Sequence, residues 1–82
     1  MEMIIEKTLV TPSGKKFNLF DDIAFTYTNK ETDHLERVIG RIVYIDDVCL
    51  DVDKVEINRF ICNPEVEYRF WYDDMDDVNY VV

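Results

Sequence analysis

The longest strand-like stretch of the sequence is residues 35–45, which read LERVIGRIVYI. In an extended chain its apolar residues occupy both faces, with Val38, Ile42 and Tyr44 on one face and Ile39, Val43 and Ile45 on the other. Gly40 interrupts the stretch at a point where a bulge or a sharp bend is tolerated. A strand that is apolar on both faces and bends at a glycine is typical of a small barrel, whose strands curve around one core.

The segments on either side of this stretch are also strand-like and are separated by turn-forming residues. Strands are predicted at residues 3–10, 16–20, 23–28, 48–52, 54–62, 66–72 and 78–82. The breaks between them contain Pro12 and Gly14, pairs of aspartates, or Asn63 followed by Pro64. Residues 73–77 are predicted to be a charged turn or a single helical turn.

Alternation also predicts which side chains of residues 48–53 face the core. Val48, Leu50 and Val52 would point inward, whereas Asp51 and Asp53 would point outward into solvent. The carboxylates of this segment are therefore expected to be available to a partner.

The composition favours the same fold class. With 82 residues the chain has the size of one small domain, residues 1–82. It contains 10 Val and 8 Ile against 1 Ala and 4 Leu, and β-branched side chains suit a pleated strand better than a helix. Closure of a small sheet protects its edges. We therefore predict a mainly β domain, a small antiparallel and partly closed barrel of five to seven strands with at most one short helical turn.

Residues 40–46, GRIVYID, resemble the first motif of Sm-like proteins, a bent strand of the form G-x-hydrophobic-x-x-hydrophobic-D. Residues 48–52 resemble the next barrel strand, so the resemblance runs from Gly40 to Val52 and is shared by SH3-like small barrels in general. It implies the barrel architecture. In Sm-like proteins an Asn after the Asp and a later Arg-Gly pair contact RNA. Here Leu50 and residues 58–60 (NRF) stand at those places, so the RNA contacts do not carry over.

The chain is strongly acidic, and its second half carries almost all of the excess charge. Residues 46–82 contain 11 acids and 3 bases, a net charge of −8, out of −9 for the whole chain. Such a charge repels phosphates, so neither direct nucleic-acid binding nor membrane binding is expected. Three interpretations of the acidity remain open. They are a solvated surface rich in Asp turns, a face that binds a basic partner, and a cation site, although no calcium-loop spacing is present.

The second half also places aromatic residues beside carboxylates, a combination typical of protein interfaces. Phe70 is predicted to lie in the core and Trp71 outside it, whereas Tyr68 and Tyr72 fit either place. We predict a partner-binding face of ten residues in this half. They are Asp51, Asp53, Glu65, Glu67, Trp71, Tyr72, Asp73, Asp74, Asp76 and Asp77. The expected partner is a basic protein surface, for example one that normally holds nucleic acid.

In size and charge the chain resembles small acidic inhibitors encoded by phages, such as anti-CRISPR and anti-restriction proteins that mimic nucleic acid. That resemblance implies an inhibitor that acts in the cytoplasm of a bacterial host. An alternative from another class is a self-assembling scaffold subunit that pairs through the edge strand at residues 78–82. An RNA-binding barrel and a small-ligand-binding protein are further alternatives.

Neither an enzyme nor a cofactor is expected, because no base–nucleophile pair is evident. Ser13 is part of a turn, His34 is the only histidine, and the chain has no glycine-rich phosphate loop. Cys49 and Cys62 lack metal-ligand spacing and are expected to be small core residues, with their pairing left open. The first residues lack the features of a secretory signal, which predicts a cytosolic protein.

Overall fold

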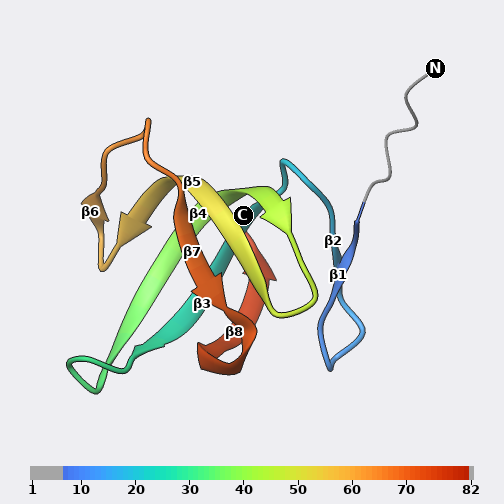
Figure 1. The fold of residues 1–82 in the computed structure, drawn as a ribbon, viewed down its shortest axis with the longest axis horizontal. Coiled ribbons are helices and arrows are strands. Elements are labelled where there is room, and N and C mark those ends of the chain that lie inside the picture. Colours follow the sequence, from blue (N-terminus) through green and yellow to red (C-terminus); the bar gives the residue numbers. More distant parts are fainter. Residues whose placement is uncertain (1–6, 82) are drawn as a thin grey trace.

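A computed structural model describes residues 7–81 of the chain. These residues form antiparallel strands, turns and one helical turn (Figure 1), which confirms the predicted mainly β, antiparallel fold. The elements in chain order are β1 (Leu9–Val10), β2 (Lys16–Phe17), β3 (Asp22–Asn29), β4 (His34–Ile45), β5 (Cys49–Ile57), β6 (Phe60–Ile61), β7 (Tyr68–Trp71), the 3₁₀ helix η1 (Tyr72–Asp74) and β8 (Met75–Tyr80).

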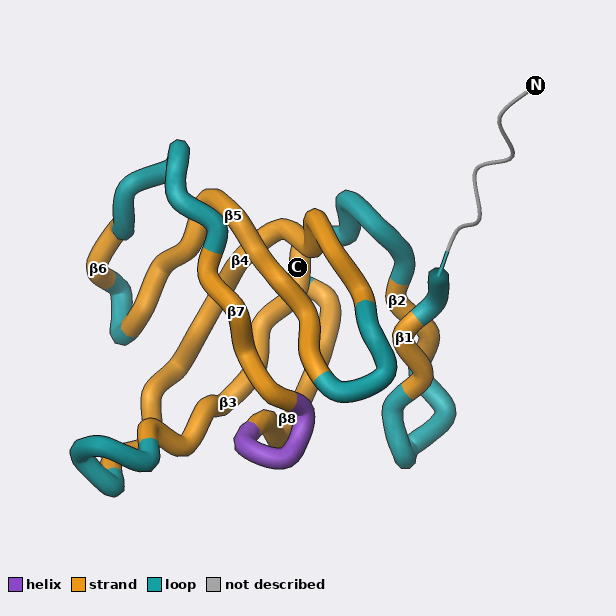
Figure 2. Tube along the Cα trace, in the orientation of Figure 1, coloured by secondary structure: helices purple, strands orange, loops and turns teal. Residues whose placement is uncertain are grey.

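One sheet contains all strands except the β1–β2 hairpin. Its order is β6-β5-β4-β3-β8. Strand β7 pairs with the first half of β5, and β6 pairs with the last residues of β5. The short helix η1 connects β7 on one side of this order directly to β8 on the other (Figure 2). Within residues 7–81 no strand pairing joins β7 to β8, so the sheet is not closed into a barrel by hydrogen bonds.

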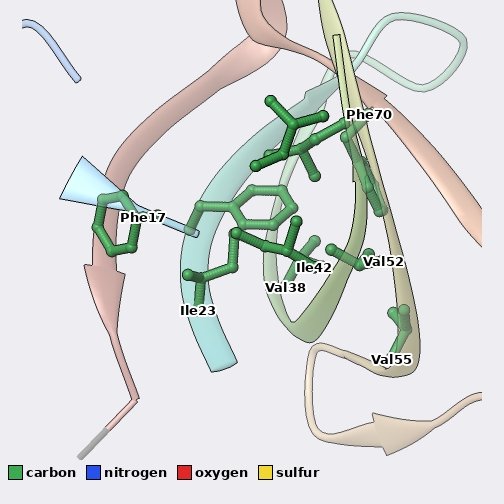
Figure 3. Packing of buried hydrophobic residues seen from close by; sticks show 10 residues of the cluster. Phe17, Ile23, Val38, Ile42, Val52, Val55 and Phe70 are labelled. Carbon is green, nitrogen blue, oxygen red and sulfur yellow. The ribbon is translucent and has the colours of Figure 1, made fainter. Parts of the chain in front are cut away.

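The core lies inside the curved sheet and is built from inward-facing residues of β2, β3, β4, β5 and β7 (Figure 3). Its buried members are Phe17, Ile23, Phe25, Val38, Ile42, Ile45, Leu50, Val52, Val55 and Phe70. The Phe70 ring of β7 meets two rings of β3 edge-on, with centroids 5.1 Å from Phe25 and 4.8 Å from Tyr27. The prediction that Phe70 is a core residue is confirmed, and this contact brings β7 over β3.

The prediction of two separate strands at residues 48–52 and 54–62 is wrong, because β5 runs without a break from Cys49 to Ile57. The chain then reverses in a two-residue turn whose residues, Asn58 and Arg59, have φ of 51° and 72°. Positive φ at both positions is the geometry that connects two antiparallel strands most tightly. Asn tolerates it, and the Asn58 side chain accepts a 2.9 Å hydrogen bond from the Arg37 amide.

The predicted faces of residues 35–45 are correct only as far as Ile42. Between Ile42 and Tyr44 the pairing with β5 shifts register, because Val43 is an extra residue on β4. A bulge of this kind reverses the alternation of the residues that follow it. Ile45 is therefore buried together with Val38 and Ile42 and Tyr44 is exposed, whereas the prediction placed Tyr44 on the face of Val38 and Ile42.

The outermost predicted strands are shorter or displaced. Of the strand predicted at residues 3–10, residues 3–6 lie outside the described residues, and only Leu9–Val10 are paired. The return strand is limited to Lys16–Phe17. The last strand starts earlier than predicted, at Met75, and ends at Tyr80. The β1–β2 hairpin lies against this last strand, since the Lys15 side chain hydrogen-bonds to Asn79 and the Tyr80 hydroxyl to the Lys16 carbonyl.

Gly40 permits a close approach of β4 to β5. The pairing of β4 with β5 is irregular here too, but the extra residue lies on β5, where Lys54 adopts a φ of 51°. A Cβ atom added at Gly40 would lie 2.9 Å from Cβ of Val52 and 3.3 Å from the Asp53 carbonyl oxygen. Glycine is therefore required for steric reasons, because Val52 packs directly on its backbone.

Replacing Gly40 by Ala should lower the free energy of unfolding by about 1–3 kcal/mol, the usual cost of overpacking a tight core. Urea unfolding followed by circular dichroism measures it. Gly14→Asn is a comparison variant without overpacking, because a Cβ atom there has no neighbour within 4 Å and its cost comes from the positive φ of 87°, which Asn tolerates better than other side chains. Equal unfolding midpoints for Gly40→Ala and the unmodified protein would contradict the steric role of Gly40.

Candidate functional site

A broad hollow on the described surface lies where three turns meet. It is a groove of about 720 Å³ between the end of β3, the turn from β4 to β5, and the segment from Trp71 through η1. Its lining residues are Tyr27, Asn29, Lys30, Glu31, Asp47, Val48, Trp71, Tyr72, Asp73 and Asp74. Four of the ten residues predicted to bind a partner are thus brought together in one groove, and the other six lie elsewhere.

Trp71 faces the groove because the residue before it is buried. Neighbouring residues of a strand point to opposite faces, so the core position of Phe70 directs Trp71 outward, where 46% of its surface is exposed. Aromatic side chains that remain accessible beside polar groups are frequent anchors of protein complexes. The prediction that Trp71 lies outside the core is confirmed.

Tyr72 fixes the turn between β4 and β5 against η1. Its hydroxyl donates a 2.7 Å hydrogen bond to the carbonyl oxygen of Asp46, and its amide donates one of 3.0 Å to the carbonyl of Val48. Burial raises the pKa of Tyr72 to about 12, so the hydroxyl remains a neutral donor at physiological pH. Asp47 is thereby held at the edge of the groove.

Asp46 is an anion whose charge is stabilised within the same turn. Its carboxylate accepts a 2.7 Å hydrogen bond from the Tyr44 hydroxyl and a second one from the Asp47 amide. These two hydrogen bonds, the one from Tyr44 above all, hold the pKa of Asp46 below its ordinary value. The turn therefore keeps its negative charge next to the groove.

Asp74 is the most enclosed carboxylate of the groove. Its side chain is only 9% exposed, and its Oδ1 lies 3.3 Å from Nζ of Lys30, a side chain that is 75% exposed. The nearby Tyr27 ring has a raised pKa, chiefly because of its own burial and then because of the negative charge of Asp74. A nearly buried anion with one exposed counter-ion and aromatic neighbours is thus the central electrostatic feature of the groove.

Asp51 and Asp53 do not point freely into solvent, which corrects the prediction made for β5. The Arg69 guanidinium donates two hydrogen bonds to Asp51, of 2.8 and 3.2 Å. Arg41 donates two to Asp53, of 3.0 and 2.7 Å. Each arginine lies directly opposite its aspartate on a neighbouring strand. Because these carboxylates are neutralised within the sheet, they belong to the fold rather than to a docking face.

The remaining predicted residues are separate from the groove. Glu65 and Glu67 are exposed in the segment that precedes β7. Asp76 and Asp77 lie near the start of β8 and line a different hollow of about 440 Å³, between β8 and the β1–β2 hairpin. The ten predicted residues therefore do not form one continuous face.

Sequence reasoning missed six of the ten residues that line the groove, namely those that come from β3 and from the other two turns. Lys30 and Glu31 belong to a polar loop that looks like ordinary solvent-exposed sequence, and Tyr27 belongs to a strand. The signal for Asp47 was present in the Asp46-Asp47 pair, which sequence reasoning treated only as a turn. These residues join the site through tertiary packing, which no local pattern reports.

Other kinds of site receive no positive support from the described residues. Within residues 7–81, no three His, Cys, Asp or Glu side chains are grouped so that they could hold a metal ion. Cys49 is buried and Cys62 is half-buried, and both are free thiols. No helix in this part of the chain is long and apolar enough to cross a bilayer. Comparisons with family models, curated proteins and solved structures gave no match, so the groove has to be interpreted from its own geometry.

Substituting Tyr72 by Phe should destabilise the domain by about 0.5–1.5 kcal/mol, because the partly buried Asp46 carbonyl loses its donor. Tyr44→Phe is the control, since the carboxylate it contacts is exposed and water can replace the lost hydroxyl. Urea unfolding of both variants measures the difference. If the two substitutions cost the same, Tyr72 does not anchor the turn.

The Arg41–Asp53 pair should make a small, pH-dependent contribution to stability. The hydrogen bond from Arg41 lowers the pKa of Asp53 in the folded chain. The contribution is therefore present above the unfolded pKa and is lost as the pH falls through the folded one. Asp53→Asn should cost less than about 1 kcal/mol at neutral pH, because the pair is partly exposed, and progressively less as the pH falls through the folded pKa of Asp53. Urea unfolding at neutral and at acidic pH measures this, and in an Arg41→Gln background the pH-dependent cost should largely disappear.

Proposed function

We propose that this protein is an acidic binding module whose groove docks on a basic surface of a partner protein. The observation that carries the proposal is the composition of the groove. Among the described residues that line it, four carboxylates, Glu31, Asp47, Asp73 and Asp74, accompany a single base, Lys30. A concave site with one dominant sign of charge focuses its field on ligands of the opposite charge.

The aromatic lining supports docking of a protein rather than attraction of simple ions. Tyr27, Trp71 and Tyr72 contribute ring surface beside the carboxylates. Lys and Arg side chains combine a cationic head with an apolar stem, so one side chain of this kind can satisfy both features. The same arrangement disfavours RNA, whose phosphates the groove would repel.

A partner surface that normally holds nucleic acid is the best complement. Such surfaces present several Lys and Arg side chains spaced to meet successive phosphates. Carboxylates on the three turns around the groove would take the place of those phosphates, and the partner would then be blocked. This is the mode of action of the small acidic phage-encoded inhibitors, such as anti-CRISPR and anti-restriction proteins, that the chain resembles in size and charge.

The same proposal includes a partly closed, SH3/Sm-like barrel as the scaffold. Two observations support it: η1 joins β7 and β8, which lie at opposite sides of the sheet order, and Phe70 of β7 packs on Phe25 of β3. Curvature of this kind brings the turns that line the groove to one end of the molecule.

Self-assembly through the last strand has weaker support than docking. The β1–β2 hairpin already contacts β8 through Asn79 and Tyr80. Asp76 and Asp77 are also exposed at its start, so two copies would bring like charges together.

Binding of a fluorescein-labelled peptide of about eight arginines, measured by fluorescence anisotropy, tests the proposal. Trp71→Ala and Asp73→Asn should each weaken binding at least about tenfold, as expected when a central anchor is removed. Binding of the unmodified protein should also weaken steeply as salt rises from about 50 to about 500 mM.

Glu67→Gln is the matched control, because it removes the same charge as Asp73→Asn at an exposed position outside the groove. If Glu67→Gln and Asp73→Asn weaken binding equally, the attraction comes from overall charge and the proposed site is wrong. Retention of affinity by Trp71→Ala would exclude the aromatic anchor.

A further inference from the structure

Three ion pairs join the described residues, and two of them share a design that the third lacks. Asp51 and Asp53 are each held by two hydrogen bonds from an arginine. Each of these arginines also lies over an aromatic ring, with Cζ of Arg69 5.8 Å from the Tyr44 centroid and Cζ of Arg41 5.8 Å from the Phe20 centroid. In this fold, then, the standard neutralisation of a carboxylate is an arginine that pairs with it and stacks on a ring.

The third pair, Lys30 with Asp74, also joins a carboxylate to a cation near aromatic rings. Its cation is a lysine and not an arginine. Lys30 makes one contact of 3.3 Å, longer than a usual charge-assisted hydrogen bond. Its side chain lies at the edge of the groove and is mostly exposed, whereas the Asp74 carboxylate is almost enclosed. A single long contact from a flexible, hydrated ammonium group is readily exchanged.

A counter-ion stabilises Asp74, because an unpaired carboxylate in a nearly buried position is costly. A cation supplied from outside would satisfy Asp74 as Lys30 does, so exchange leaves no charge unpaired. After exchange Lys30 returns to full hydration, since three quarters of its side chain already faces solvent.

We propose that Lys30 occupies, in the free protein, the position beside Asp74 that an arginine side chain of the partner takes in the complex. Docking then exchanges Lys30 for that arginine at Asp74. This inference rests on the proposed function and specifies its ligand. A guanidinium can donate two hydrogen bonds to Asp74 and stack on the rings of Tyr27 or Trp71, as Arg69 and Arg41 do elsewhere in the chain. An ammonium group can only repeat the contact of Lys30, so the groove should select arginine over lysine.

Three variants at exposed lysines separate this exchange from general charge effects. Lys30→Gln removes the internal competitor, and Lys54→Gln removes the same charge from an exposed position on β5, outside the groove. Lys30→Arg keeps the charge but supplies an internal guanidinium. Thermal unfolding of each variant verifies that it is folded.

The probes are three fluorescein-labelled peptides of equal length, in which four positions are all arginine, all lysine or all citrulline. The unmodified protein should bind the arginine peptide at least about fivefold more tightly than the lysine peptide, and citrulline should abolish binding. Lys30→Gln should bind the arginine peptide several-fold more tightly than Lys54→Gln does. Lys30→Arg should bind it several-fold more weakly than the unmodified protein.

The exchange is overturned if Lys30→Gln gains no more than Lys54→Gln, if Lys30→Arg binds like the unmodified protein, or if lysine and arginine peptides bind equally. With any of these results, weaker binding by Trp71→Ala and Asp73→Asn would still uphold the groove as the docking site. Loss of the groove itself has a different signature, namely equal effects of Asp73→Asn and Glu67→Gln.

Discussion

The packing of one side chain, Phe70, determines where the parts of the candidate site lie. Phe70 is buried edge-on against Phe25 and Tyr27, and it joins the last third of the chain to the first long strand. Because neighbouring strand residues point to opposite faces, burial of Phe70 exposes Trp71. The chain then turns at once through η1, so Asp73 and Asp74 follow Trp71 closely in the sequence and line the same groove. The contact that completes the core is therefore also the reason that an aromatic side chain is exposed next to carboxylates.

Some carboxylates of the chain are paired with an arginine and others are not, and strand pairing determines which. Asp51 and Asp53 lie in the sheet, where the opposite residue on the next strand is an arginine that can be held in register. Carboxylates in turns have no opposite residue, and of the four described ones that line the groove only Asp74 is paired, with Lys30. A net charge of −9 on a domain with a small core would otherwise weaken the fold through self-repulsion. Neutralisation inside the sheet and concentration of charge at the turns allow stability and an acidic surface to coexist.

The sequence predicts the features that depend on local alternation and misses those that depend on register. The mainly β fold, the burial of Phe70 and the exposure of Trp71 all follow from patterns within a few residues. The exposure of Tyr44 does not, because one extra residue on β4 reverses the alternation beyond it. The pairing of Asp51 with Arg69 is likewise invisible, since the two residues are 18 positions apart and meet only through strand register. The position of Lys30 in the groove is equally invisible, because tertiary packing brings it there from a loop whose sequence is not distinctive.

The enclosure of Asp74 is the observation that most supports the proposal that a partner docks in the groove rather than on the exposed loops. If acidity served solubility alone, exposed residues such as Glu65 and Glu67 would suffice, and an enclosed carboxylate would add cost without benefit. An asparagine at position 74 would avoid that cost, because a neutral amide needs no counter-ion. The chain instead keeps the charge and meets it with a lysine that is mostly in solvent. A carboxylate that is nearly enclosed and loosely paired should interact strongly with an incoming cation, because much of its desolvation has already occurred in the free protein.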